Sequence, residues 1–99
     1  MWGMIARITT VAGKRDEMIG LLKQSAAGMP GCISYVVAED ASAPNVLWVT
    51  EVWQSQQDHD ASLSLRQVQE VLPRARALMA NFERVAVTMP VWDAASPES

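Results

Sequence analysis

The stretch CISYVVAEDASAPNVLWVTEVW, residues 32–53, predicts a β-hairpin. Its two ends, residues 32–40 and 46–53, are rich in β-branched and aromatic residues, and the ASAPN between them is a turn rich in Pro, Asn and Ser. Side chains alternate between the two faces of a strand, and in the second run both faces are bulky and apolar. One face carries Val46, Trp48 and Val52, and the other carries Leu47, Val49 and Trp53. Both faces of the hairpin therefore need a cover.

The segment before the hairpin predicts a strand and then a helix. Residues 2–11 alternate between apolar and mixed positions, as a strand does. Gly13 breaks this strand, and the acids Asp16 and Glu17 suit the first turn of a helix. Apolar residues then recur at helical spacing until the GMPG sequence, where Gly28 can cap the helix.

The segment after the hairpin predicts two helical pieces and a last strand. Ser55, with Asp58 three residues later, is typical of a helix N-cap followed by an acid. A second helical segment is expected over 64–81, kinked or split at Pro73 because proline lacks the backbone donor that a helix interior needs. Residues 82–92 form the fourth expected strand, and 93–99 form a polar tail that we expect to be disordered.

The resulting β-α-β-β-α-β order predicts an α+β, ferredoxin-like fold with a four-stranded antiparallel sheet, in one domain over residues 1–92. Both helices of such a fold cover the same face of the sheet. Since the strands are apolar on both faces, a second sheet from another copy of the chain is the simplest cover for the open face. The sequence therefore predicts a homodimer.

Composition narrows the class of function. The chain has 99 residues and a net charge of −3, with no run of Lys or Arg, so nucleic-acid binding and a basic membrane-binding patch are not expected. No signal peptide or membrane-spanning run is recognisable, and the single cysteine, Cys32, excludes an internal disulfide and fits a reducing cytoplasm. Six Met and four Trp suggest wide, adaptable apolar surfaces.

Several stretches together resemble the antibiotic biosynthesis monooxygenase (ABM) superfamily. They are MIARITTVAGKRDEMIGLL near the N-terminus, PGCISY at the start of the second strand, EVWQSQQDHDASLS after the third, and a final FERVAVTMPV. The resemblance implies a dimeric α+β barrel in which two sheets pack face to face and each protomer holds a pocket between sheet and helices. It also implies oxidation of phenols or quinols by molecular oxygen with no metal, flavin or haem, although other members of the superfamily degrade haem.

The family pattern places a histidine about nine residues after the aromatic residue of the third strand. In this sequence Ser62 occupies that place, and the only histidine, His59, lies three residues earlier. Residues three apart share a helix face, so His59 and Ser62 are expected to point the same way. Two interpretations of His59 stay open: a base that accepts a proton from a phenol at neutral pH, or a solvated residue between Asp58 and Asp60.

The other candidates for the pocket are aromatic or polar. Trp53 and Trp48 lie on opposite faces of the third strand, so one faces the pocket and the other the partner's sheet. Glu51 shares a face with Trp53 and could pair with Arg7 or Arg84, or contact a ligand hydroxyl. The remaining candidates are Tyr35 and Ser62, which could orient a substrate oxygen, and Arg66, which could attract an anion at the pocket mouth or stay solvated.

These observations favour a cofactor-independent monooxygenase acting on a phenolic or quinol-type aromatic compound and O2. His59 would assist deprotonation, while Trp53 and Trp48 would shape the cavity. Two alternatives remain: a haem-binding or haem-degrading relative, in which His59 is the proximal ligand, and a non-catalytic module that binds a small aromatic molecule. One His and one Cys do not suffice for a zinc or iron site of the usual kind, and neither a phosphate-binding loop nor a GxSxG motif is present.

Overall fold

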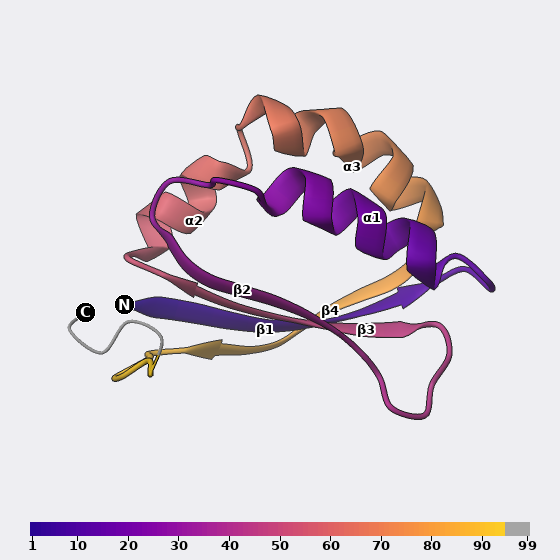
Figure 1. The fold of residues 1–99 in the computed structure, drawn as a ribbon, viewed down its shortest axis with the longest axis horizontal. Coiled ribbons are helices and arrows are strands. Elements are labelled where there is room, and N and C mark those ends of the chain that lie inside the picture. Colours follow the sequence, from indigo (N-terminus) through magenta and orange to yellow (C-terminus); the bar gives the residue numbers. More distant parts are fainter. Residues whose placement is uncertain (95–99) are drawn as a thin grey trace.

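The computed structural model describes residues 1–94 and contains a four-stranded antiparallel sheet with its helices on one face (Figure 1). The strand order is β2-β3-β1-β4. No helix among these residues is long and apolar enough to cross a membrane. The elements are β1 (Trp2–Thr10), α1 (Arg15–Ala26), β2 (Cys32–Glu39), β3 (Val46–Trp53), α2 (Gln56–Ser62), α3 (Arg66–Leu78) and β4 (Met79–Thr88).

The order of elements and of strands confirms the predicted ferredoxin-like α+β fold. The hairpin of β2 and β3 forms the predicted antiparallel pair, and β3 also pairs with β1 from Trp2↔Trp53 to Thr9↔Val46. The predicted cap is present too, since the Ser55 side chain accepts a hydrogen bond from the Asp58 backbone N–H at 3.1 Å. The two predicted helical pieces after the hairpin are present as α2 and α3.

The boundary between α3 and β4 corrects one prediction. The helix expected over 64–81 ends at Leu78, and β4 begins at Met79 rather than at residue 82. The cause is a contact that is distant in sequence, because the Leu78 carbonyl accepts a hydrogen bond from the Val11 backbone N–H at 2.8 Å. Helix α3 is continuous through Pro73 and is not split.

The end of β4 also differs from the predicted strand over residues 82–92. The strand stops at Thr88 instead of running to residue 92, because Pro90 has no backbone N–H to donate to a sheet ladder. Of the predicted tail, Asp93 and Ala94 lie outside regular structure, and residues 95–99 lie outside the described residues.

The core lies between the sheet and the helices. The inner face of β3 supplies Leu47, Val49 and Trp53, all almost fully buried. Leu47 and Val49 pack with residues such as Met18 of α1 and Leu78 of α3. The other face of the sheet has no helix over it in the described chain (Figure 1). Its apolar side chains are, from the strand register, Ile5, Val36, Val46, Trp48 and Val52.

Substitutions at two glycines test this fold, because they are expected to change the free energy of unfolding in opposite directions. Gly31 has φ of +78°, and a Cβ there would lie 2.5 Å from a carboxylate oxygen of Asp58, so Gly31→Ala is expected to lower the free energy of unfolding by about 1–2 kcal/mol or more. Gly20 lies in α1 with open space around it, so Gly20→Ala is expected to raise it by about 0.5–1 kcal/mol. Urea unfolding measures both; stabilisation by Gly31→Ala would contradict the turn described here.

Candidate functional site

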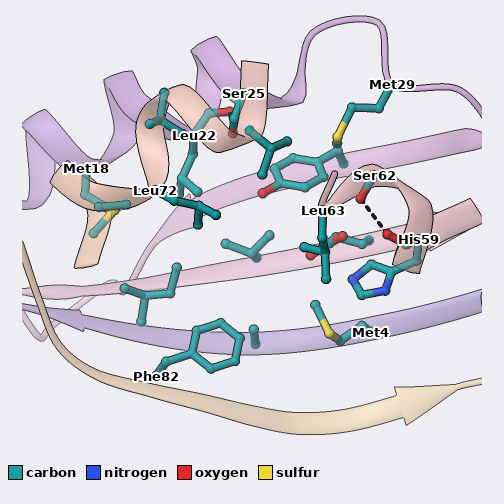
Figure 2. Close-up of a pocket in the computed structure, with 18 of the residues that line it drawn as sticks. Met4, Met18, Leu22, Ser25, Met29, His59, Ser62, Leu63, Leu72 and Phe82 are labelled. Carbon is teal, nitrogen blue, oxygen red and sulfur yellow. Dashed lines mark hydrogen bonds between the residues drawn. The ribbon is translucent and has the colours of Figure 1, made fainter. Parts of the chain in front are cut away.

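A cavity of about 340 Å³ lies between the sheet and the helices, where the sequence predicted a pocket (Figure 2). Strand β1 forms part of its wall with Met4, Ala6 and Ile8. Four of the six methionines line it, which accounts for the high Met content of the chain. Figure 2 shows His59, Ser62 and Met4 at one end of the cavity and Met18 and Phe82 at the other. His59 and Ser62 therefore lie together at one end of a mainly apolar cavity.

His59 is buried and lines this cavity. Its residue exposure is only 5%, so it is not a solvated residue of the helix surface. The predicted pairing with Ser62 on one helix face is confirmed, since both line the cavity, and the Ser62 hydroxyl donates to the His59 carbonyl at 2.6 Å (Figure 2). The structure thus favours the interpretation of His59 as a group that can meet a ligand.

Three neighbours fix the His59 ring. Its centroid lies 4.7 Å from that of Trp2, tilted by 36°, and 5.6 Å from that of Trp53, in an edge-to-face arrangement. Its Nδ1 lies 3.0 Å from a carboxylate oxygen of Asp60. Because a carboxylate only accepts hydrogen bonds, Nδ1 must carry the proton, and in the neutral ring Nε2 then presents a lone pair. The arrangement leaves Nε2 as the proton-accepting atom.

Glu51 is the second buried titratable group of the cavity. It is 7% exposed, and its Oε1 accepts a hydrogen bond from the Trp53 indole N–H at 2.9 Å. Burial raises the pKa of the Glu51 carboxyl, an effect that the Trp53 hydrogen bond and the charges of His59 and Arg84 partly offset. Among residues 1–94 no basic side chain forms an ion pair with it, so the alternative in which Arg7 or Arg84 pairs with Glu51 is wrong.

Tyr35 also lines the cavity, as predicted. Burial raises the pKa of its phenol, and the nearby Glu51 charge adds to the effect, so Tyr35 stays protonated and can donate a hydrogen bond. Of the predicted residues, the structure therefore brings His59, Ser62 and Tyr35 together on the cavity. Trp53, which was predicted to shape the cavity directly, is fully buried and does not line it. It acts from behind the lining, because its ring packs against His59 and its indole N–H donates to Glu51.

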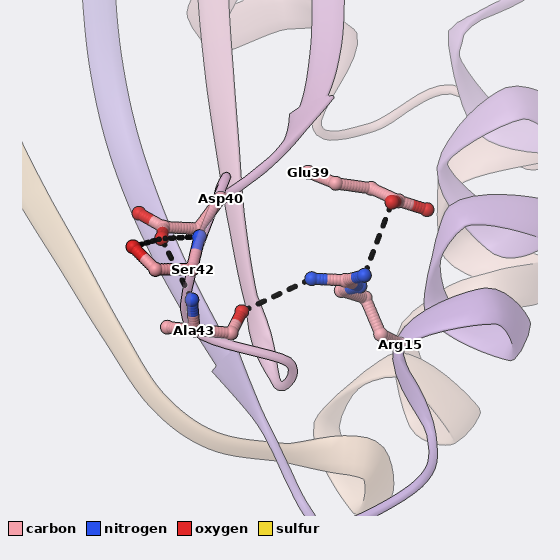
Figure 3. Close-up of polar contacts among 5 residues, drawn as sticks. All are labelled: Arg15, Glu39, Asp40, Ser42 and Ala43. Carbon is pink, nitrogen blue, oxygen red and sulfur yellow. Dashed lines mark hydrogen bonds and ion pairs between the residues drawn. The ribbon is translucent and has the colours of Figure 1, made fainter.

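Trp48 lies on the opposite face of the sheet, so the prediction that it shapes the cavity is not met. It pairs with Arg7 in the register, and the Arg7 guanidinium lies 5.8 Å from its ring centroid. Its indole N–H donates to Asp40 at 2.8 Å, and this bond, with two backbone N–H bonds in the β2–β3 turn, lowers the pKa of Asp40 to about 2. Figure 3 shows Asp40 holding the turn through the backbone N–H groups of Ser42 and Ala43.

Arg66 also lies outside the cavity. Its side chain is 92% exposed and pairs with Glu70 one turn further along α3, so the solvated interpretation applies. Arg15, by contrast, ties α1 to the hairpin, because its guanidinium pairs with Glu39 and donates to the Ala43 carbonyl (Figure 3).

Sequence reasoning missed Trp2 as a neighbour of the site, and it named Arg84 only as a possible ion-pair partner of Glu51. Alternation already placed Trp2 on the face of Met4, but its contact with His59 depends on the β1–β3 register, which pairs Trp2 with Trp53. Arg84 reaches the cavity from β4 because a bulge pairs it with Ala6, and a bulge leaves no mark in the residue pattern. In residues 1–94 no group of three or more His, Cys, Asp or Glu side chains is placed to hold a metal ion.

Comparisons with known proteins fit this architecture. The family model described as antibiotic biosynthesis monooxygenase matches residues 1–74. The chain belongs to this family. A comparison with curated proteins finds no match.

Solved structures of the ABM fold include similar chains. A protein of Chloroflexus aurantiacus, provisionally assigned as an antibiotic biosynthesis monooxygenase, is 42% identical, covers 93% of this chain and 94% of its own, and superposes with a TM-score of 0.89. A Nitrosomonas europaea protein with the same provisional assignment is 12% identical over 93% of this chain and 100% of its own, with a TM-score of 0.82. A Mycobacterium tuberculosis protein is 21% identical over 94% and 97%, with a TM-score of 0.78. The two more distant structures show the fold alone.

The raised pKa of Glu51 predicts how Glu51→Gln changes stability with pH. The folded protein holds this proton to higher pH than the unfolded chain, so the wild type loses stability as pH rises from about the ordinary value of 4.5 past the raised pKa. Gln has no proton to lose and its amide oxygen can keep the Trp53 bond. The Tm of Glu51→Gln is therefore expected to rise relative to that of wild type as pH increases over this window. Each kcal/mol of difference in unfolding free energy corresponds to a Tm difference of roughly 4–8 °C. Thermal scans of both proteins at matched pH measure the difference; a difference independent of pH would contradict the burial of an unpaired acid.

Proposed function

We propose that this ABM protein is a cofactor-independent monooxygenase that oxidises a phenolic or quinol-type aromatic compound with molecular oxygen. Family membership supports a general monooxygenase-type function. The observation that carries the finer proposal is the buried His59 ring, whose proton-bearing Nδ1 is held by Asp60 and whose Nε2 remains to accept a proton at a largely apolar cavity.

The chemistry begins with transfer of the substrate's phenolic proton to His59 Nε2. Asp60 stabilises the imidazolium that forms, through the Nδ1–H bond. The resulting anion is rich enough in electrons to reduce O2 by one electron, and the two radicals combine at a ring carbon. The peroxide, formed at a ring carbon that carries a hydrogen, takes the proton back from His59. The O–O bond then breaks as this carbon loses its hydrogen, so that water leaves and a carbonyl remains at the carbon. The substrate supplies all the electrons, one oxygen atom enters the product and the other leaves as water.

The cavity suits such a substrate in size and lining. Its volume lies at the lower end of the range for small-molecule pockets, which suits a compact aromatic ring system. Tyr35 and Ser62 offer hydroxyl groups that can orient a substrate oxygen, and Trp53 holds the His59 ring in place. An apolar surround strengthens each of these polar contacts, because it excludes water that would screen them.

Oxygen uptake by the metal-free protein with a panel of quinols and polycyclic phenols tests this proposal. Wild type is expected to exceed the spontaneous rate, and His59→Ala to lower the enzymatic rate by roughly 10²–10⁴-fold, the usual contribution of a general base. Arg66→Ala is the control, because Arg66 is solvated and outside the cavity, and it should keep the wild-type rate.

Uptake that is equal in wild type and His59→Ala would remove His59 from the mechanism. Tight binding of the aromatic compounds without any uptake would contradict the oxygenase and favour a binding module.

We also propose that the protein is a homodimer built through the open face of the sheet. That face carries Val36, which is 53% exposed, together with Ile5, Trp48 and Val52. Arg7 lies on the same face, and its Nε is buried with no hydrogen-bond partner in residues 1–94. An apolar surface that contains an unsatisfied donor is well matched by a second sheet of the same chain.

Light scattering at low micromolar concentration tests the dimer. Wild type is expected at about twice the chain mass of 10.8 kDa. Val36→Arg should shift the mass towards one chain because it buries a charge in the sheet–sheet contact. Gln56→Arg, which adds the same charge on helix α2, is the control and should stay dimeric. A wild type that scatters as a single chain would refute the dimer.

A further inference from the structure

Glu51 has no role in the mechanism above, yet it is buried and lines the cavity. Strand alternation directs its side chain to the covered face of β3, between Val49 and Trp53, where it is 7% exposed. Trp53 satisfies one carboxylate oxygen, at Oε1. No hydrogen bond within residues 1–94 reaches Oε2, and Oε2 is not among their fully buried unsatisfied atoms. The second oxygen is therefore open to the cavity that Glu51 lines.

A structural role does not account for this carboxylate. The basic side chains that could neutralise it are engaged elsewhere or distant: Arg7 pairs with Glu83 at 2.6 Å on the opposite face, and Arg84 influences Glu51 only through its charge. A buried carboxyl that has given up its hydrogen bonds to water and accepts only one hydrogen bond from a neutral donor lowers the stability of the fold. An apolar residue of similar size at this position would generally destabilise the fold less. Features that cost stability and face a cavity are typical of ligand-binding groups.

The elements around Glu51 bring it close to His59. The Trp53 indole joins the two, since its N–H binds Glu51 while its ring packs against the His59 ring at 5.6 Å between centroids. His59 reaches the cavity from α2 and Glu51 from β3, so the two approach a bound ring from different elements. Besides His59, Arg84 acts on Glu51 through its charge, and the Glu51 charge in turn helps to raise the pKa of Tyr35 and of Cys32.

We propose that Glu51 contacts the substrate and accepts a hydrogen bond from a second hydroxyl group, so that the cavity selects dihydroxyarenes over arenes with a single hydroxyl. The inference rests on the proposed function for the nature of the ring. His59 takes the proton of one hydroxyl, and Oε2 of Glu51 receives the hydrogen bond of the other. Above its raised pKa the Glu51 carboxyl is ionised, and a hydrogen bond to an ionised acceptor is about twice as strong as one between neutral groups, which makes Glu51 a specificity-determining residue.

Anaerobic calorimetric titration tests this directly, because it measures binding without turnover. The probes are 1,4-dihydroxynaphthalene and 1-naphthol, which differ by one hydroxyl group. At a pH above the raised pKa of Glu51, wild type is expected to bind the diol about 10- to 100-fold more tightly, the usual value of a hydrogen bond to a charged group. In Glu51→Met, which has no acceptor, the ratio of the two Kd values should fall below about threefold, and in Glu51→Gln it should be intermediate.

Two controls separate this role from a structural one. Glu70→Gln, an exposed acid on α3, should keep the wild-type ratio. Glu51→Gln should melt no lower than wild type at neutral pH while its selectivity falls to the intermediate value. If the carboxylate were needed only for the fold, Glu51→Gln would lower Tm and leave the ratio of the two Kd values unchanged.

The inference is overturned if wild type binds the two probes equally, if it binds neither, or if Glu51→Met keeps the wild-type ratio. These outcomes are independent of oxygen uptake. Loss of diol selectivity in Glu51→Met, in a protein that consumes no oxygen, supports the role of Glu51 in recognition and counts against the oxygenase alone.

Discussion

The hydrogen bond between the Trp53 indole and the Glu51 carboxyl is the interaction on which the site depends. It exists because alternation along β3 sends both side chains to the covered face of the sheet, two residues apart. Trp53 is fully buried and fills the core, while it also packs against His59 and holds one oxygen of Glu51. One aromatic side chain thus ties the packing of the sheet to the two titratable groups that face the cavity.

The cavity itself follows from the mixture of side chains around it. Ala6 in the middle of β1 leaves space that a larger residue would fill, and methionines from several elements border that space. Methionine is flexible and polarizable, so it adapts to a ligand at little cost. The protein therefore gives up some core packing, and carries an unpaired buried acid, in the region where a substrate would contribute the missing contacts.

Much of the fold could be predicted from local patterns. The hairpin, the bounds of β3 and the Ser55 cap were predicted correctly because alternation, turn residues and cap residues act within a few positions of one another. The predicted end of α3 was wrong because the observed end is set by the hydrogen bond between the Leu78 carbonyl and the Val11 N–H, which lies far away in sequence. The shared face of His59 and Ser62 followed from helix geometry, whereas the Trp2 contact with His59 required the register of β1 against β3. Trp48 was assigned to the cavity although alternation had already placed it opposite Trp53.

We expect ligands to bind between the sheet and the helices, against His59 and Glu51, both of which contact the buried Trp53. The chain has one histidine and four tryptophans, so NMR can follow each ring separately. Trp53 and Trp48 lie on opposite faces of β3, and each indole N–H is bound to a different carboxylate, which makes Trp48 an internal control. Under anaerobic addition of 1,4-dihydroxynaphthalene, the His59 ring and Trp53 indole signals are predicted to shift while the Trp48 indole signal stays in place. A shift of Trp48 with His59 and Trp53 unchanged would place the ligand on the other face of the sheet and contradict the account.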